Sequence, residues 1–140
     1  MIYLDTSVLG AIFFREPNAA VVLAQIEAAR ARGLVISAWT LTEMASVGAI
    51  KERMATIDRV ARRQALAFFQ RFASSSLDLT EIEPSDFRAS ALLMDGPCPL
   101  RAGDALHLAV AKRLPAGLAT LDHRLAAAAA DCGVPLLSVG

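Results

Sequence analysis

Short apolar runs that alternate with longer segments of helical periodicity restrict most strongly how this chain can fold. Ile2–Leu4 and Leu34–Ser37 are typical of buried strands, and each precedes a segment whose apolar residues recur at helical spacing. Strands that alternate with helices are joined by crossover connections, which build a parallel sheet covered by helices. We therefore predict an α/β protein with a central, mainly parallel sheet of four to five strands.

The other elements continue this alternation. We expect further strands at residues 77–82, 118–121 and 136–139. Helices are expected at residues 8–14, 40–53, 56–73, 84–95 and 103–114. Two more helices are expected: one begins at Pro17 and Asn18 and is closed by Gly33, and the other follows Asp122. Residues 74–76 are expected to form a turn and residues 96–99 a loop. Because no repeat or low-complexity linker divides the sequence, we expect residues 1–140 to form a single domain.

Composition and charge limit where the protein can act and what it can bind. Hydrophobic residues make up 55% of the chain, yet no apolar stretch is long enough to span a membrane and the first residues do not resemble a signal peptide. We therefore expect a cytoplasmic protein with Cys98 and Cys132 as free thiols. The formal net charge is zero, which argues against a broad basic face for nucleic acid. Any attraction for phosphate must be local.

Two aspartates follow predicted strands. Asp5 comes directly after the first strand, and Asp122 comes after the strand at 118–121. In open α/β sheets, functional groups collect beyond the carboxyl ends of the strands. Each aspartate could instead only cap the helix that follows it.

Two further carboxylates have apolar surroundings. Asp104 lies in the first turn of a predicted helix, on the same stripe as Leu108 and Ala111, so it faces the body of the protein. The helix dipole alone could also favour an acid there. Glu43 follows the second strand and shares its helical face with Val47 and Ile50. A solvated stripe explains Glu43 poorly.

Together, Asp5, Glu43, Asp104 and Asp122 predict a metal site. Like charges at close range raise one another's pKa, and a bound cation is the usual way to keep several carboxylates ionised together. An all-oxygen set without cysteine or paired histidine suits Mg²⁺ or Mn²⁺. Such an ion activates water and neutralises charge on a phosphoryl oxygen, so the favoured chemistry is hydrolysis of a phosphodiester.

Four segments resemble PIN-domain proteins, and more narrowly the VapC-type toxins of bacterial toxin–antitoxin pairs. They are Asp5-Thr6-Ser7, Thr42-Glu43, residues 100–109 around Asp104, and residues 119–125 around Asp122. The resemblance extends over nearly the whole chain and is most specific around Asp104 and Asp122. It implies a three-layer α/β/α domain and a metal-dependent endoribonuclease that cuts RNA, is usually a homodimer and is inhibited by a cognate antitoxin.

The resemblance also implies roles for individual residues. Asp5 and Asp104 would be the principal metal ligands, and Glu43 and Asp122 would complete the acidic set. Thr6 or Ser7, together with Thr120, would orient water or phosphate. Ala102-Gly103 stands where many relatives have a hydroxylated residue or leucine, so we expect a looser approach to Asp104, with Gly103 as a possible N-cap.

Several other residues near these motifs have simpler interpretations. His107 could support a ligand one turn after Asp104, but we interpret it as a satisfied, partly buried core histidine. Trp39 is interpreted as a packing residue, since proteins that bind single strands usually present several aromatics. Arg15 and Arg101 are the best candidates for phosphate contacts, although each could simply be solvated.

The helix expected at residues 56–73 carries more apolar residues than one core-facing side can use. Leu66, Phe69 and Ala73 lie off the main stripe. The helix could be sandwiched between the core and a neighbouring helix. Alternatively, Phe69 could line a groove that receives an amphipathic segment of an antitoxin.

Three other functions were weighed. A phosphatase of the haloacid dehalogenase type needs a second aspartate two residues after the first, where Ser7 stands. A PIN-fold nuclease that acts on DNA is not separated from a ribonuclease by composition. A catalytically silent PIN-fold scaffold is disfavoured, because an idle cluster of carboxylates would destabilise the protein without its cation.

Overall fold

The computed structural model describes residues 1–140 and confirms the α/β architecture. Its elements in chain order are β1 (Ile2–Leu4), α1 (Thr6–Phe13), α2 (Ala19–Ala29), the 3₁₀ helix η1 (Arg30–Arg32), β2 (Leu34–Ser37), α3 (Ala38–Arg53), α4 (Arg59–Ser76), β3 (Asp78–Thr80), α5 (Pro84–Met94), α6 (Ala102–Arg113), β4 (Gly117–Ala119), α7 (His123–Asp131) and β5 (Leu136–Leu137). Gly33 ends the second helical segment with a φ of 81°, which glycine adopts without strain.

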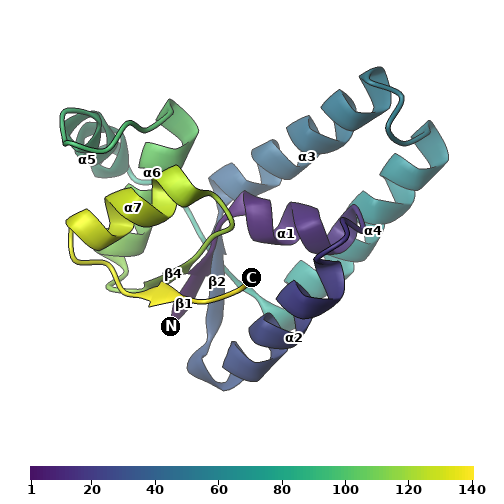
Figure 1. Ribbon diagram of the computed structural model, residues 1–140, viewed down its shortest axis with the longest axis horizontal. Coiled ribbons are helices and arrows are strands. Elements are labelled where there is room, and N and C mark those ends of the chain that lie inside the picture. The colour runs from purple at the N-terminus through teal and green to yellow at the C-terminus, as the bar shows by residue number, and fades with distance from the viewer.

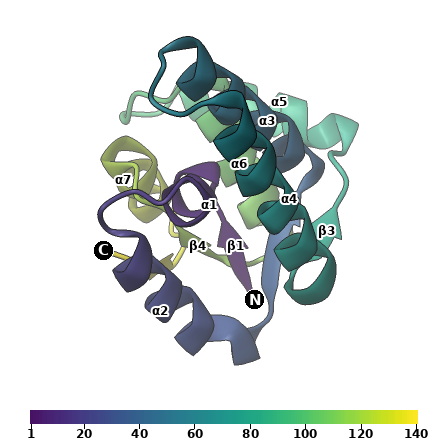
Figure 2. The ribbon, with the colours of Figure 1, turned by 90° about the vertical axis from the view of Figure 1, so that its right-hand side faces the viewer.

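The five strands form one parallel sheet in the order β3-β2-β1-β4-β5. Helices α1 to α4 cover one face of the sheet and α5 to α7 cover the other, which gives three layers (Figure 1). Figure 2 shows the first layer from outside, with α2 and α4 in front of the strands. The chain builds outward from β1 through β2 to β3, and then returns to the other side of β1 with β4 and β5.

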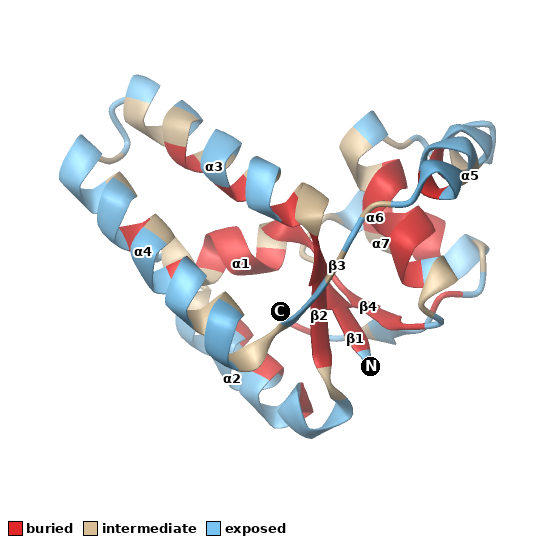
Figure 3. Cartoon of the chain, turned by 180° about the vertical axis from the view of Figure 1, so that it is seen from behind, coloured by how far each residue is buried: buried red, intermediate tan, exposed pale blue.

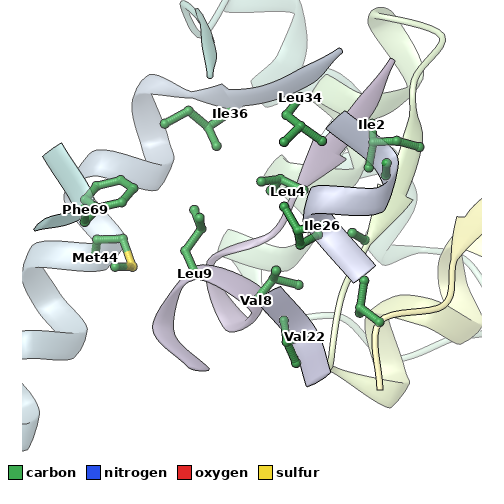
Figure 4. Close-up of a cluster of buried hydrophobic side chains, with 13 residues drawn as sticks. Ile2, Leu4, Val8, Leu9, Val22, Ile26, Leu34, Ile36, Met44 and Phe69 are labelled. Atoms are coloured by element: carbon green, nitrogen blue, oxygen red, sulfur yellow. The ribbon is translucent and has the colours of Figure 1, made fainter. Parts of the chain in front are cut away.

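Alternating side chains of the central strands divide the core between the two layers. Ile2 and Leu4 of β1 point into the cluster under α1 to α4 (Figure 4), whereas Tyr3 points toward α6 and α7. The central strands and the inward faces of α1 and α6 are buried, while α4 and α5 expose most of their outer surface (Figure 3). Because successive side chains of a strand point to opposite faces of the sheet, Tyr3 of β1 reaches α6 while Ile2 and Leu4 face the other layer.

The α4 region corrects three sequence-based expectations. The helix begins at Arg59, because Asp58 is its N-cap and accepts a hydrogen bond from the Ala61 N–H at 2.7 Å. It continues through Ser76, so the turn expected at residues 74–76 is wrong. Phe69 is only 2% exposed and packs edge-on against Phe13 with ring centroids 5.7 Å apart. Phe69 is therefore a core residue and cannot line a groove for a partner.

Two simpler expectations can also be compared with the structure. Both cysteines are free, as the sequence indicated. None of the helices combines the length and apolar character needed to cross a membrane.

Candidate active site

The order of the strands determines where a site can form. In the sheet, β2 and β3 lie on one side of β1, and β4 and β5 lie on the other. The direction in which successive strands are added therefore reverses between β1 and β4. Beyond the carboxyl ends of such a strand pair, the loops diverge and leave a crevice. Asp5 follows β1 directly, and Thr120 to Asp122 follow β4.

Asp5 is held firmly at the bottom of this crevice. Its side chain is almost fully buried, and its Oδ2 accepts hydrogen bonds from the hydroxyls of Ser7 at 2.6 Å and Thr120 at 2.7 Å. Ser7 also accepts the backbone N–H of Leu121 at 2.9 Å, which ties the loop after β4 to α1. Oδ1 of Asp5 accepts no hydrogen bond and lies 3.6 Å from Nε2 of His107. One carboxylate oxygen is therefore fixed and the other is available.

Glu43 reaches the same crevice from α3. Its Oε1 accepts a hydrogen bond from the Thr6 hydroxyl at 2.8 Å and a second, very short one from Nε2 of His107. Burial favours the neutral form, but the hydrogen bonds from His107 and from the Thr6 hydroxyl outweigh it and lower the pKa of Glu43. Glu43 is therefore ionised at neutral pH with Oε2 free of protein hydrogen bonds.

Asp104 lies in the first turn of α6 and makes no side-chain hydrogen bond within the protein. Burial raises its pKa from 3.8 to about 6, and the charges of Asp5, Asp122 and Glu43 add to the rise. The four carboxylates that the sequence singled out are therefore near enough to act on one another electrostatically. Asp104 bears the repulsion of the other three.

Asp122 caps the helix that follows it and also borders the crevice. It is the N-cap of α7, and its Oδ1 accepts the backbone N–H groups of Arg124 at 2.8 Å and Leu125 at 3.0 Å. Its own N–H donates to the Thr120 hydroxyl at 3.0 Å. The second oxygen, Oδ2, remains free of protein hydrogen bonds. Asp122 and Asp104 both line an open cavity of about 400 Å³.

The hydroxylated residues contact the carboxylates directly. Ser7 and Thr120 bind Asp5, and Thr6 binds Glu43. In this structure their hydroxyl groups orient carboxylate oxygens.

His107 contacts the carboxylates of the crevice more closely than the sequence suggested. It was expected to be partly buried, but it is fully buried, and both of its ring nitrogens make hydrogen bonds. Nδ1 lies 2.6 Å from the hydroxyl of Tyr3, whose pKa burial raises to about 12. The available signal was its place three residues after Asp104 on the inward stripe of α6, which did not reveal the contact with Glu43.

Gly103 is packed tightly, so the expected looser approach to Asp104 is wrong. A Cβ at Gly103 would lie 3.0 Å from Oε2 of Glu43 and 3.2 Å from Nε1 of Trp39. Gly103 is also inside α6, whose N-cap is Arg101. Trp39 packs here as expected, but its buried Nε1–H has no hydrogen-bond partner.

The open side of the crevice carries basic residues. Arg101, His123 and Arg124 line the same cavity as Asp104 and Asp122, and no carboxylate lies within salt-bridge distance of either arginine. Arg15, the other expected phosphate contact, instead borders an apolar cavity between α1 and α4. The structure therefore places Arg101 beside the acidic site and Arg15 at a different cavity.

These residues fit a divalent cation. Single ligand atoms of Asp5, Glu43 and His107 lie within 4.8 Å of one another. His107 already uses Nε2 to bind Glu43, and a protonated nitrogen cannot coordinate a metal, so we interpret it as a support for Glu43. The oxygens left free on the carboxylates form the hard, anionic donor set that Mg²⁺ and Mn²⁺ prefer. A cation would also relieve the repulsion that raises the pKa of Asp104.

Comparisons with known proteins identify the family and agree with the fold. The sequence model of the family described as PIN domain matches residues 2–131. Among solved structures, Mycobacterium tuberculosis VapC20, described as a toxin that cleaves the sarcin-ricin loop, is 17% identical with a TM-score of 0.69, over 91% of this chain and 95% of that one. Rickettsia felis VapBC2 bound to a promoter DNA fragment is 16% identical with a TM-score of 0.71, over 97% of both chains. No curated protein sequence matches significantly.

Proposed function

Because the chain belongs to the PIN domain family, we propose that it is a magnesium-dependent endoribonuclease and the toxin of a toxin–antitoxin pair. The observation that carries the proposal is the gathering of Asp5, Glu43, Asp104 and Asp122 around the switch point of the sheet, where three of them raise the pKa of the fourth. The toxin role is supported by the likeness to VapC20 and VapBC2. RNA as the substrate implies a cytoplasmic location.

The chain's own residues would prepare the site for hydrolysis. Asp5 Oδ1, Glu43 Oε2 and the Asp104 carboxylate would hold the ion, with Asp122 Oδ2 completing the set. When bound, Mg²⁺ would lower the pKa of a water molecule and offset charge on a phosphoryl oxygen. The hydroxyls that bind Asp5 and Glu43 fix these carboxylates before substrate arrives, which reduces the reorganisation needed during reaction.

RNA would enter from the open side. Arg101 and Arg124 have no carboxylate partner and border the cavity that contains Asp104 and Asp122. A phosphate that approaches four carboxylates is repelled, so cationic side chains beside them would offset that repulsion locally. A small number of arginines suffices in a chain whose formal net charge is zero.

The antitoxin would bind between α1 and α4, on a surface different from the one expected from sequence. An apolar cavity there is lined by Phe13, Phe14, Arg15, Ile57, Ala61, Gln64, Ala65 and Phe68. Phe68 is 46% exposed, in contrast to Phe69. Helix α1 joins this groove to the acidic site, and its eight residues span only about 12 Å. An amphipathic helix in the groove could therefore extend a basic side chain to the carboxylates.

The groove can be tested with neighbouring phenylalanines. Phe68→Glu should weaken antitoxin binding and inhibition by about tenfold, or 1.4 kcal/mol, while the free protein still cleaves RNA. Phe69→Glu should prevent folding, because it would bury a charge in the core. Unchanged antitoxin affinity in Phe68→Glu would exclude this groove.

We also propose a homodimer, as the family resemblance implies. Leu79 of the edge strand β3 and Leu41 of α3 are exposed and both line a cavity of about 420 Å³. An unpaired edge strand with apolar neighbours is a surface that association would cover. Light scattering of the purified protein measures the oligomeric state, and Leu79→Lys should shift it toward monomer.

The central experiment is incubation of partner-free protein with total cellular RNA, with and without Mg²⁺. We expect cleavage only with the metal, and sequencing of the cut ends would identify the target. Single- and double-stranded DNA incubated in parallel test the alternative of a DNA nuclease. Protein that binds the metal and the antitoxin but cleaves neither nucleic acid would instead be a silent scaffold.

A further inference from the structure

A chain of buried hydrogen bonds runs beneath the candidate metal site. The Ser37 hydroxyl lies 2.8 Å from that of Tyr3, which lies 2.6 Å from Nδ1 of His107, and Nε2 of His107 contacts Glu43. Ser37, Tyr3 and His107 are all fully buried. The three come from β2, β1 and α6, so these hydrogen bonds join two adjacent central strands to the helix layer on one face of the sheet.

The partners determine which atom donates each proton. Oε1 of Glu43 can only accept, so Nε2 of His107 must carry a hydrogen. In the neutral ring Nδ1 is then an acceptor, and the hydrogen between it and Tyr3 comes from the tyrosine hydroxyl. The oxygen of Tyr3 can in turn accept from Ser37. Ser37, Tyr3 and His107 each donate one hydrogen bond in this series, and each donates to the next group in the direction of Glu43.

This direction has a consequence for the two oxygens of Glu43. Oε1 accepts from both His107 and Thr6, so neither of its lone pairs is free for a metal. Oε2 has no hydrogen bond and points toward the first turn of α6, where a Cβ at Gly103 would lie 3.0 Å away. Glu43 is thus held in one orientation with a single free oxygen directed at the first turn of α6.

We propose that His107 and Tyr3 are positioning residues that fix Glu43 and so determine the affinity of the site for its divalent cation. This inference rests on the proposed metal site. A ligand carboxylate that is free to rotate must be ordered when the ion binds, and that ordering weakens binding. A histidine with no contact to the ion can therefore still control its affinity.

The direction of the hydrogen bonds can be measured without metal or substrate. The sequence has two histidines, so His123→Gln leaves His107 as the only imidazole to be observed. Long-range ¹H–¹⁵N spectra at pH 8 should show the tautomer with hydrogen on Nε2 and an acceptor Nδ1. A ring protonated on Nδ1 would overturn the proposed direction.

Affinity for Mn²⁺, measured by electron paramagnetic resonance, tests the positioning role. His107→Ala should weaken Mn²⁺ binding by about 10- to 100-fold, and Tyr3→Phe by about threefold. His107→Gln should recover part of the loss, because its amide can still donate to Glu43. Ser90→Ala is a matched control, since it also removes a buried hydroxyl but one that bonds within α5 to the Phe87 carbonyl at 2.8 Å.

Each variant must first be shown to fold by circular dichroism. If His107→Ala does not fold, Tyr3→Phe still provides the test, because it removes only a hydroxyl and keeps the shape of the core. A purely structural role would lower the melting temperature of Tyr3→Phe and of Ser90→Ala alike and leave the Mn²⁺ affinity of both unchanged. That result would overturn the inference while the proposed function stands. If wild type binds no Mn²⁺, the metal site of the proposed function is itself wrong.

Discussion

The four carboxylates of the candidate site occupy two different environments. The first half, which we call the buried half, consists of the buried Asp5 and the half-buried Glu43, which accept side-chain hydrogen bonds from Ser7, Thr120, Thr6 and His107. The open half consists of Asp104 and Asp122, which accept no side-chain hydrogen bonds and border the cavity with the arginines. The buried half has one carboxylate with a lowered pKa, whereas the open half has one whose pKa is raised to about 6.

This difference indicates a division of labour within one site. Hydrogen bonds fix the geometry of the buried half and lower the pKa of Glu43, so that carboxylate is charged before any cation arrives. The open half has its charges opposed by their neighbours and is exposed to incoming ligands. We infer that the buried half provides affinity and position, while the open half couples cation binding to substrate binding.

Loss of a ligand from either half should have the largest effect. Asp5→Asn and Asp104→Asn should each reduce RNA cleavage by a factor of at least about 10³, because on the proposed function each would remove a ligand of the ion that generates the nucleophile. Glu43→Gln should be comparably damaging. Steady-state kinetics on a defined RNA oligonucleotide measure the loss, with circular dichroism as the control for folding. Asp104→Asn with near wild-type activity would show that the open half is dispensable.

Stabilisation by metal is the next largest effect. At a Mg²⁺ concentration of about 100 times its dissociation constant, the free energy of unfolding should increase by roughly 2.7 kcal/mol, measured by denaturant titration. Asp104→Asn should abolish most of this gain while the protein remains folded. An equal gain in wild type and variant would locate the metal away from these carboxylates.

The sequence predicted the fold, and it predicted that the four carboxylates would lie near one another, because both depend on local patterns. Strand runs followed directly by Asp5 and Asp122 are visible in order along the chain, and parallel pairing brings such positions to one edge. Glu43 and Asp104 were found by their unusual apolar surroundings.

Three features could not be predicted, because each depends on contacts between distant segments. His107 of α6 and Glu43 of α3 are 64 residues apart, and only the folding of both segments around the sheet brings them into contact. The burial of Phe69, with Phe68 exposed, depends on the rotation of α4 about its axis, which an all-round apolar pattern leaves undetermined. The close packing around Gly103 involves Trp39 and Glu43, and no local signal marks it.

The arginines of the open half should have a smaller effect on substrate binding. Arg101→Ala and Arg124→Ala should each raise KM for RNA by about threefold to tenfold with kcat little changed, and should reduce the slope of log KM against log salt by about 0.7. Arg88→Ala on α5 is the matched control, because Arg88 is exposed and pairs with no carboxylate. A fall in kcat with unchanged KM would assign these arginines to the transition state instead.

The smallest expected effect is on the stability of the metal-free protein. There Asp104→Asn should be stabilising, although the same substitution should remove activity. In the metal-free protein the pKa of Asp104 is raised from 3.8 to about 6, so the folded state resists its ionisation. The resulting destabilisation is absent below about pH 4, develops as pH rises to about 6, and is complete above that value. Asp104→Asn removes the charge and should stabilise the metal-free protein at pH 8.

Because Asp104 is partly exposed, solvent screening limits this gain to roughly 1 kcal/mol, or a rise of about 2–4 °C in melting temperature. Asp86→Asn provides a control of opposite sign. The bidentate contact with Arg113 outweighs the burial of Asp86 and lowers its pKa, so its loss should destabilise the protein at pH 8. Thermal melts in chelator at pH 4 and pH 8 measure both differences. If Asp104→Asn has no effect at pH 8, the carboxylates do not repel one another without metal, and the open half needs no cation to be stable.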